Sequence, residues 1–286
     1  MKILVTAEKG QLGSELKKIS HTNNNFEWVF TDRHSFNISD LENVNVYLNK
    51  SNPNIIINCA AYTGVDRAED DFETANIINH KAVSLIAKWC NDNNCKLIHV
   101  STDYVYDGNS LLPYIEEDQT DPLNNYGKTK LFGDIECQKN NPSSIIIRTS
   151  WLYSSFGNNF LTKMINLMMD IDEIKVVDDQ FGSPTYAGDL ASTIILLIKN
   201  KKWQPGIYNF TNSGIISWYD FANEIKSIYG YKVNIKPVST KEYSQKAKRP
   251  KYSILDNSKI INAFKIKQMD YLYSLNKCIK IIQNES

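Results

Sequence analysis

Short apolar runs alternate with longer amphipathic segments over the first 150 residues, and this alternation restricts the fold more than any other feature. Strands are predicted at residues 2–6, 28–31, 55–58, 97–101 and 145–148, most of them apolar on both faces. Such strands are typical of parallel sheets covered by helices on each side. Helical periodicity fills the intervening segments, at residues 11–19, 41–50, 72–90 and 126–138. The sequence therefore predicts an α/β fold with a doubly wound parallel sheet.

The alternation loosens after about residue 150. Helices are expected at 160–169 and 190–199 and strands at 174–177 and 206–210, while Ser217 is a good N-cap for a helix over 218–229. We expect residues 1–150 to form the core, and residues 151–286 to form a smaller C-terminal lobe interleaved with the last elements of the core. This lobe should lie at the carboxyl edge of the sheet, where doubly wound folds bind ligands.

Composition excludes several classes of protein. The 286 residues contain 32 basic and 32 acidic side chains, so no strong field favours nucleic acid or an anionic membrane. The five cysteines are scattered and the histidines lack metal-binding spacing, so no metal is expected. The start of the chain does not resemble a signal peptide, and the longest apolar run, residues 194–198, is far shorter than a membrane span. We expect a cytoplasmic protein that is monomeric or homodimeric.

A glycine-containing turn follows the first predicted strand and opens the first helix, at residues 6–13. Gly10 and Gly13 let the backbone approach a pyrophosphate, whose charge the helix N-terminus stabilises. Asp32 ends the second strand, 19 positions after Gly13, where an acid can bind the adenosine ribose. The sequence predicts a Rossmann-type dinucleotide site. Ala7 replaces the usual first glycine, and we expect it to keep a negative φ.

Tyr126 and Lys130 form a Tyr-x-x-x-Lys pair at helical spacing, so both side chains can point into one cleft. A phenol titrates near pH 10 in water, and a nearby ammonium is expected to lower its pKa toward the working range. Thr102 leaves the fourth strand about 24 residues earlier, at the sheet edge that faces the same cleft. Because Tyr and Lys four residues apart are common on helices, the pair alone does not indicate a catalytic site. The expected position of Thr102 at the same cleft makes a catalytic role the favoured interpretation.

These motifs, in this order, give the chain a resemblance to the extended short-chain dehydrogenase/reductase superfamily and, within it, to the dTDP-4-dehydrorhamnose reductases. The resemblance runs from residue 1 to about 256. Its further motifs are Asn58-Cys59-Ala60-Ala61-Tyr62-Thr63, Ser101-Thr102-Asp103-Tyr104, Arg148-Thr149-Ser150-Trp151, residues 179–185, and Arg249-Pro250 with Ser253.

The resemblance implies a role for each matched residue. The catalytic residues would be Thr102, Tyr126 and Lys130. Contacts to the sugar nucleotide would come from Thr102, Asp103 and Trp151. The dinucleotide would be bound by Gly10, Gln11, Leu12, Gly13, Asp32, Arg33, Asn37, Ile38, Ala60, Ala61, Tyr62, Thr63, Val100, Tyr126 and Lys130. Asn37-Ile38 departs from the usual acidic and apolar pair near the adenine. Cys59 and Trp218 are interpreted as packing residues.

The implied activity is NAD(P)H-dependent reduction of a dTDP-linked 4-keto-6-deoxyhexose to dTDP-L-rhamnose, for nucleotide-sugar and polysaccharide biosynthesis. Asp32 favours NADH, whereas Arg33 and Lys9 can approach the 2′-phosphate of NADPH, so we expect use of either cofactor. Two alternatives stay open. One is a sugar-nucleotide epimerase or dehydratase of the same superfamily. The other is a non-catalytic NADP-binding regulatory subunit.

Overall fold

The protein, a computed structural model that describes residues 1–285, is built on a six-stranded sheet in the order β10-β5-β4-β3-β1-β2. All neighbouring strands are parallel. The strands are β1 (Lys2–Val5), β2 (Glu27–Phe30), β3 (Ile55–Asn58), β4 (Lys96–Thr102), β5 (Ile145–Thr149) and β10 (Gly206–Asn209). The strand order reverses at β1: β2 lies on one side of β1, and β3 and the later strands lie on the other side. The carboxyl ends of the strands at this point are where such sheets bind nucleotides.

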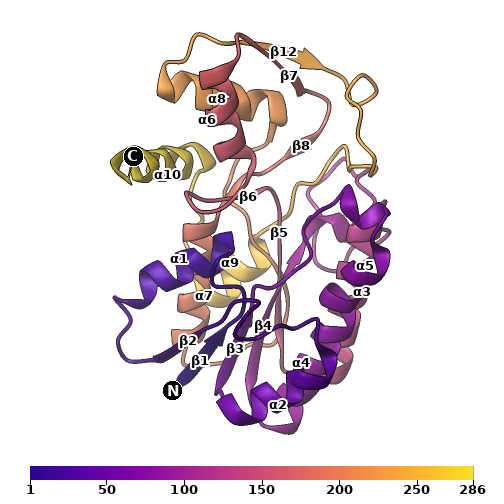
Figure 1. Ribbon diagram of the computed structural model, residues 1–286, viewed down its shortest axis with the longest axis vertical. Coiled ribbons are helices and arrows are strands. Elements are labelled where there is room, and N and C mark those ends of the chain that lie inside the picture. Colours follow the sequence, from indigo (N-terminus) through magenta and orange to yellow (C-terminus); the bar gives the residue numbers. More distant parts are fainter. Residues whose placement is uncertain (286) are drawn as a thin grey trace.

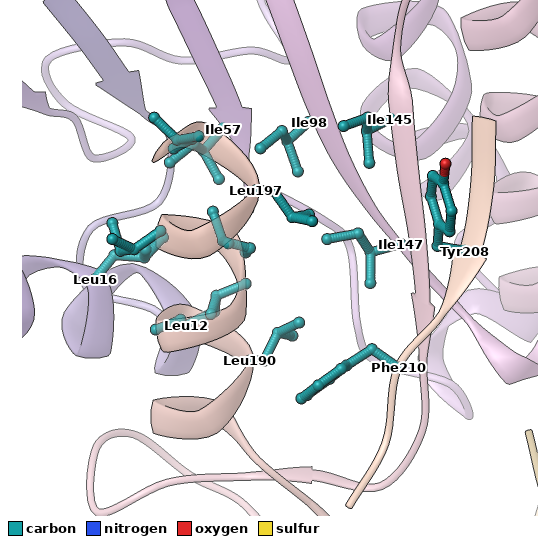
Figure 2. Close-up of a cluster of buried hydrophobic side chains, with 14 of the residues drawn as sticks. Leu12, Leu16, Ile57, Ile98, Ile145, Ile147, Leu190, Leu197, Tyr208 and Phe210 are labelled. Carbon is teal, nitrogen blue, oxygen red and sulfur yellow. The ribbon is translucent and has the colours of Figure 1, made fainter. Parts of the chain in front are cut away.

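Helices cover both faces of this sheet (Figure 1). One face carries α1 (Gln11–Ser20), α7 (Ala187–Lys199) and α9 (Ser258–Phe264), and the other carries α2 (Leu41–Ser51), α4 (Ala82–Asp92) and α5 (Asn125–Asn140). Successive strand residues point to opposite faces. Ile3 and Val5 pack against the first group of helices, as Figure 2 shows for Ile57 of β3 and Ile147 of β5, and Leu4 packs against the second. The predicted doubly wound α/β fold is confirmed.

The helix expected over residues 72–90 is interrupted. It consists of α3 (Phe72–Asn76), one π-helical turn (Ile77–Lys81) and α4. The interruption contains Asn79, whose side chain accepts from the backbone N–H of Tyr62 and donates to the Thr129 hydroxyl. The backbone carbonyl of Asn79 packs directly on Gly133 of α5. Such wide turns are a recognised irregularity that hydrophobic periodicity does not reveal.

The chain leaves the sheet after β5 and builds a second hydrophobic cluster beyond its carboxyl edge (Figure 1). This part contains α6 (Phe160–Asp170), α8 (Trp218–Tyr229) and α10 (Tyr271–Glu285) around β7 (Glu173–Val177), which pairs with β12 (Asn234–Val238). Short pairs join β6 (Leu152–Tyr153) to β9 (Thr185–Tyr186) and β8 (Phe181–Gly182) to β11 (Ile216–Ser217). Between these elements α7, β10 and α9 return to the core. No helix within residues 1–285 is long and apolar enough to cross a membrane.

We predict that Gly133→Ala destabilises the protein, although alanine is the better helix former. The added methyl group would overlap the carbonyl oxygen of Asn79. Such overpacking costs about 1–3 kcal/mol, against a gain of about 1 kcal/mol in helix propensity. Urea denaturation should therefore show a lower free energy of unfolding. Lys128→Ala, at an exposed position of the same helix, is the control and should leave stability within about 0.5 kcal/mol.

Candidate active site

A cleft of about 660 Å³ lies at the carboxyl edge of the sheet, between the core and the second cluster. Both parts of the chain supply its walls. The residues that line it are Ala7, Lys9, Gly10, Gln11, Leu12, Gly13, Cys59, Ala61, Thr63, Val65, Val100, Ser101, Thr102, Asp103, Tyr104, Tyr126, Lys130, Thr149, Ser150, Trp151, Leu152, Gly157, Asn158, Phe160, Trp218 and Arg249. No three His, Cys, Asp or Glu side chains in the described part of the chain are placed to hold a metal.

The glycine turn forms one end of the cleft. Gly10 is the N-cap of α1, and Gly13 lies so close to Ala7 that a Cβ atom would overlap the Ala7 backbone. The expectation that Ala7 keeps a negative φ is wrong, since its φ is 56°. This left-handed conformation is held by hydrogen bonds on both sides: Gly10 N donates to Ala7 O at 2.9 Å and Glu8 N donates to Thr31 O at 2.8 Å. The turn therefore has the positive-φ backbone that a glycine at this position would adopt, and Ala7 carries backbone strain as a result.

The acid that ends β2 is paired with a lysine of the glycine turn. Lys9 Nζ lies 2.5 Å from Asp32 Oδ2, and the backbone N–H groups of His34 and Ser35 donate to Oδ1 at 3.0 Å. The hydrogen bond from Lys9, followed by those from Ser35, holds the pKa of Asp32 below its usual range. Lys9 thus neutralises the carboxylate that was expected to repel a 2′-phosphate. Arg33 is exposed beside this pair.

Four further residues assigned to the dinucleotide do not line the cleft. Ile38 is buried among the core side chains on the α2 face of the sheet, and the side-chain oxygen of exposed Asn37 accepts from the N–H and hydroxyl groups of Ser39. Tyr62 packs on the same core and its hydroxyl donates to Asp71 at 3.2 Å. Ala60 also packs against that core, while its N–H donates to Thr6 Oγ1. None of these four residues lines the cleft, and their contact with the dinucleotide stays a prediction.

Thr102, Tyr126 and Lys130 meet in the cleft. Thr102 ends β4, and the other two lie one turn apart at the start of α5. Asn124 caps this helix by accepting from the N–H of Gly127 at 2.8 Å. Gly127 packs on the carbonyl group of Tyr104, where any Cβ atom would overlap. The Tyr-Gly sequence thus lets α5 approach the end of β4 closely enough for the three side chains to share one cleft.

Burial sets the protonation of the helix pair. It lowers the pKa of Lys130 to about 8, although the charge of Asp134 opposes the shift, and Lys130 Nζ donates to Val100 O at 2.7 Å. It raises the pKa of Tyr126 to about 12, against the opposing hydrogen bond from Thr102. The expected lowering of the phenol pKa is therefore wrong for the protein without ligands, because desolvation and the charges of Asp103 and Asp134 outweigh the hydrogen bond from Thr102. The phenol stays protonated at neutral pH.

Asp103 is a buried carboxyl group beside the catalytic trio. Its Oδ1 accepts from Thr102 Oγ1 at 3.0 Å. Burial raises the pKa of Asp103 to about 7, although hydrogen bonds from Ser253 and Thr102 oppose the shift. Four buried side-chain atoms of the cleft have no hydrogen-bond partner among residues 1–285: Gln11 Oε1, Ser101 Oγ, Asp103 Oδ2 and Thr149 Oγ1. Such unpaired groups are costly unless a ligand or solvent satisfies them, so they fit a polar ligand that spans the cleft.

The far wall of the cleft is aromatic. Trp151 and Trp218 stack with ring centroids 3.5 Å apart and planes inclined by 8°. Trp151 has a φ of 47°, which is strained for a bulky residue, and its ring packs on Gly182, where a Cβ atom would overlap it. The cleft position expected for Trp151 is observed. Trp218 packs on its neighbours as expected, but it also lines the cleft.

Several cleft residues were not predicted as site residues. Cys59, interpreted as a packing residue, lies at the end of β3 and reaches the cleft wall. Arg249 makes two hydrogen bonds to Asp66, with Nη2 2.8 Å from Oδ2 and Nη1 3.0 Å from Oδ1, and so fastens the C-terminal segment over the cleft. The Arg-Pro motif was a usable signal for Arg249, whereas nothing in the sequence marks Asn158.

A glycine turn at the strand-order reversal and a Tyr-x-x-x-Lys pair in the same cleft define a dinucleotide-dependent oxidoreductase of the Rossmann type. The family described as "RmlD substrate binding domain" matches residues 1–284. The chain is 38% identical to a dTDP-4-dehydrorhamnose reductase from Aggregatibacter actinomycetemcomitans, over 96% of this chain and 97% of the relative. The chain belongs to this reductase family.

Solved structures agree. A dTDP-4-dehydrorhamnose reductase from Clostridium acetobutylicum has a TM-score of 0.94 and 39% identity, covering 99% of this chain and 100% of that one. The enzyme of the same name from Bacillus anthracis, solved in complex with NADP, has a TM-score of 0.92 and 35% identity, covering 98% and 99%.

We predict that Ala7→Gly stabilises the protein. Glycine adopts a φ of 56° without a Cβ penalty, which relieves about 1–2 kcal/mol of strain. The more flexible unfolded chain offsets about 0.4–1 kcal/mol of this, so the net gain should be up to about 1.5 kcal/mol. Thermal unfolding measures it. Ala87→Gly in α4 is the control and should destabilise by at least about 0.5 kcal/mol. A loss at Ala7 as large as at Ala87 would contradict strain there.

Proposed function

We propose that this chain reduces the C4 ketone of dTDP-4-dehydro-6-deoxy-L-mannose to dTDP-L-rhamnose with NADPH or NADH. The proposal extends to a place in nucleotide-sugar and cell-surface polysaccharide biosynthesis in the cytoplasm, as a monomer or homodimer. The observation that carries it is the meeting of Thr102, Tyr126 and Lys130 beside the glycine turn, in a chain of this reductase family.

The residues of the turn fit a dinucleotide. Gly13 lets α1 pack directly on the backbone of Ala7, the N-terminus of α1 faces the cleft, and Gln11 has an unpaired buried oxygen there. Gly10, Gln11 and Leu12 would hold the pyrophosphate and Asp32 the adenosine ribose. Val100, Thr63 and Lys130 would surround the nicotinamide end. The bound cofactor supplies a hydride to C4 of the sugar.

The chain supplies the proton. Tyr126 is protonated at neutral pH and can donate its hydroxyl hydrogen to the C4 oxygen as negative charge develops there. The resulting phenolate is stabilised by the Lys130 ammonium one helical turn away. Thr102 can hydrogen-bond the same oxygen once its hydroxyl turns away from Asp103, to which it donates in this structure. Hydride and proton together complete the reduction to the alcohol.

The substrate's other parts have matching partners in the cleft. Trp151 and Trp218 offer a flat apolar wall, and Phe160 packs beside Trp218 at a centroid distance of 4.6 Å. Arg249 lines the cleft wall, and its guanidinium, which is bonded to Asp66, would suit the diphosphate. Asp103 would accept a sugar hydroxyl through its unpaired Oδ2.

The two alternatives make different predictions for one assay. The reductase consumes one NAD(P)H for each dTDP-4-dehydro-L-rhamnose, which absorbance at 340 nm follows directly. An epimerase or dehydratase regenerates its cofactor and shows no net consumption. A regulatory subunit binds NADP without turnover. The sequence Asp103-Tyr104 lacks the Asp-Glu pair by which the dehydratases resemble one another, and this favours the reductase.

We predict that Tyr126→Phe lowers kcat at least about 10²-fold, because only the exchangeable proton is lost. Cofactor and substrate affinity should stay within about twofold, measured by calorimetry, since the ring remains. Tyr243→Phe, at an exposed tyrosine, is the control and should keep wild-type turnover. Turnover of Tyr126→Phe within a few-fold of wild type would remove the phenol from the mechanism.

Cofactor choice depends on the charges at the β2 end of the site. We predict that Arg33→Ala raises KM for NADPH about ten- to thirty-fold, equivalent to about 1–2 kcal/mol, and leaves KM for NADH nearly unchanged. Lys9→Ala should change selectivity in the same direction, because Asp32 then keeps its full charge near the 2′-phosphate. Equal losses for both cofactors in Arg33→Ala would show that Arg33 does not contact this phosphate.

A further inference from the structure

A chain of buried polar side chains runs from the end of β1 to Lys130. Thr6 follows β1, Asn58 ends β3, His99 lies in β4 and Asp134 lies in α5, one turn beyond Lys130. The side chains of His99 and Asp134 are 0% and 1% exposed. Buried groups of this kind must satisfy one another, so their hydrogen bonds fix where each proton lies.

Two backbone N–H groups determine the direction of the hydrogen bonds in this chain of side chains. The N–H groups of Cys59 and Ala60 both donate to Thr6 Oγ1 at 3.0 Å. They occupy both acceptor positions of this hydroxyl, which must then donate its own hydrogen, to Asn58 Oδ1 at 2.8 Å. The amide of Asn58 is thereby oriented with its oxygen toward Thr6.

The oriented amide in turn fixes the tautomer of His99. Asn58 Nδ2, which carries only hydrogens, lies 3.1 Å from His99 Nδ1. Nδ1 must therefore accept, and the ring proton lies on Nε2. Burial, together with the charge of Lys130, holds the pKa of His99 well below its usual range, so the ring stays neutral.

The Nε2–H group lies between two charges on α5. Nε2 is 3.9 Å from Asp134 Oδ1 and 3.5 Å from Lys130 Nζ. Asp134 Oδ2 accepts from Arg148 Nε at 3.2 Å, whereas Oδ1 is buried with no hydrogen-bond partner in the described part of the chain. Because Nε2 already carries a hydrogen, it cannot accept from Lys130. The ammonium instead donates to Val100 O at 2.7 Å, and Lys130 lines the cleft.

We propose that His99 is a positioning residue for Lys130: its fixed Nε2–H faces Asp134 and turns the ammonium away from the interior, toward Val100 and the cleft. The proposal rests on the proposed function in that it gives Lys130 its role beside Tyr126. The remaining titratable groups around Lys130 are Cys59 and Cys137, whose thiol pKa values burial raises to about 12, so both are neutral. Asp134, itself bonded to Arg148, is thus the nearby anion.

The tautomer can be measured without any activity. Protein labelled with ¹⁵N-histidine contains four histidines, and His99 is assigned by the signal that His99→Phe lacks. Long-range ¹H–¹⁵N correlation spectra should show a neutral ring with its hydrogen on Nε2 from about pH 6 to pH 9. An Nδ1–H tautomer, or a ring that becomes charged in this range, would overturn the proposal whether or not the chain is a reductase.

The consequence for Lys130 is tested by Asn58→Asp. A carboxylate can only accept, so the ring hydrogen should move to Nδ1 and leave Nε2 to accept from Lys130. We expect kcat to fall about tenfold with KM for the sugar nucleotide unchanged, since the ammonium is drawn inward. The alkaline limb of the pH profile, near pH 8 in the wild type, should rise by about one unit because the added negative charge stabilises the ammonium.

Asn141→Asp is the matched control. Asn141 is equally buried, lies outside this chain of side chains, and uses its amide oxygen as an acceptor for Ser143 N. This variant should lose some stability and keep both kcat and the alkaline limb. An Asn58→Asp protein in which the spectra show the changed tautomer but kcat stays at its wild-type value would overturn the positioning role. If Asn58→Asp does not fold, the wild-type spectra still decide the tautomer.

Discussion

Helix α5 lies close enough to β4 for Lys130 to reach the carbonyl oxygen of Val100, and the active site depends on this approach. Gly127 permits it by packing on the Tyr104 backbone just after β4, and Gly133 lets the same helix pack on the Asn79 backbone. The same approach buries Lys130 and Tyr126, and this burial lowers the pKa of Lys130 and raises the pKa of Tyr126 relative to their values in water. Helix packing and acid–base chemistry therefore have one cause here, and a substitution that displaces α5 changes both.

Strand runs and motif order were sufficient to predict the sheet, the glycine turn and the meeting of Tyr126 with Lys130, because period and spacing determine them. What was not predicted depends on neighbours that are distant in the sequence. Ala7 adopts a positive φ because the hydrogen bonds from Glu8 N to Thr31 O and from Gly10 N to Ala7 O hold the turn in place. The phenol pKa rises rather than falls because desolvation is a property of the folded cleft. Trp218 reaches the cleft because Trp151 stacks on it.

Two of the five non-glycine residues with positive φ within residues 1–285 lie in the cleft wall. Ala7 brings the backbone of the turn close to Gly13, and Trp151 places its ring against Trp218 and Gly182. Strained backbone at both ends of one cleft, together with its four unpaired polar atoms, indicates a site organised for a ligand rather than for stability alone. Membership of a dinucleotide-dependent reductase family accounts for that arrangement.

The return of the chain to the sheet after the second cluster bears on how the protein folds during synthesis. Strand β10 pairs with β5, and α7 covers one face of the same sheet, yet both are made after β5 has left the ribosome. Until residues 187–209 emerge, the isoleucines of β5 lie at an open sheet edge with one face uncovered. Such edges recruit other strands, so nascent chains that stall before residue 209 should be the ones that aggregate or require a chaperone.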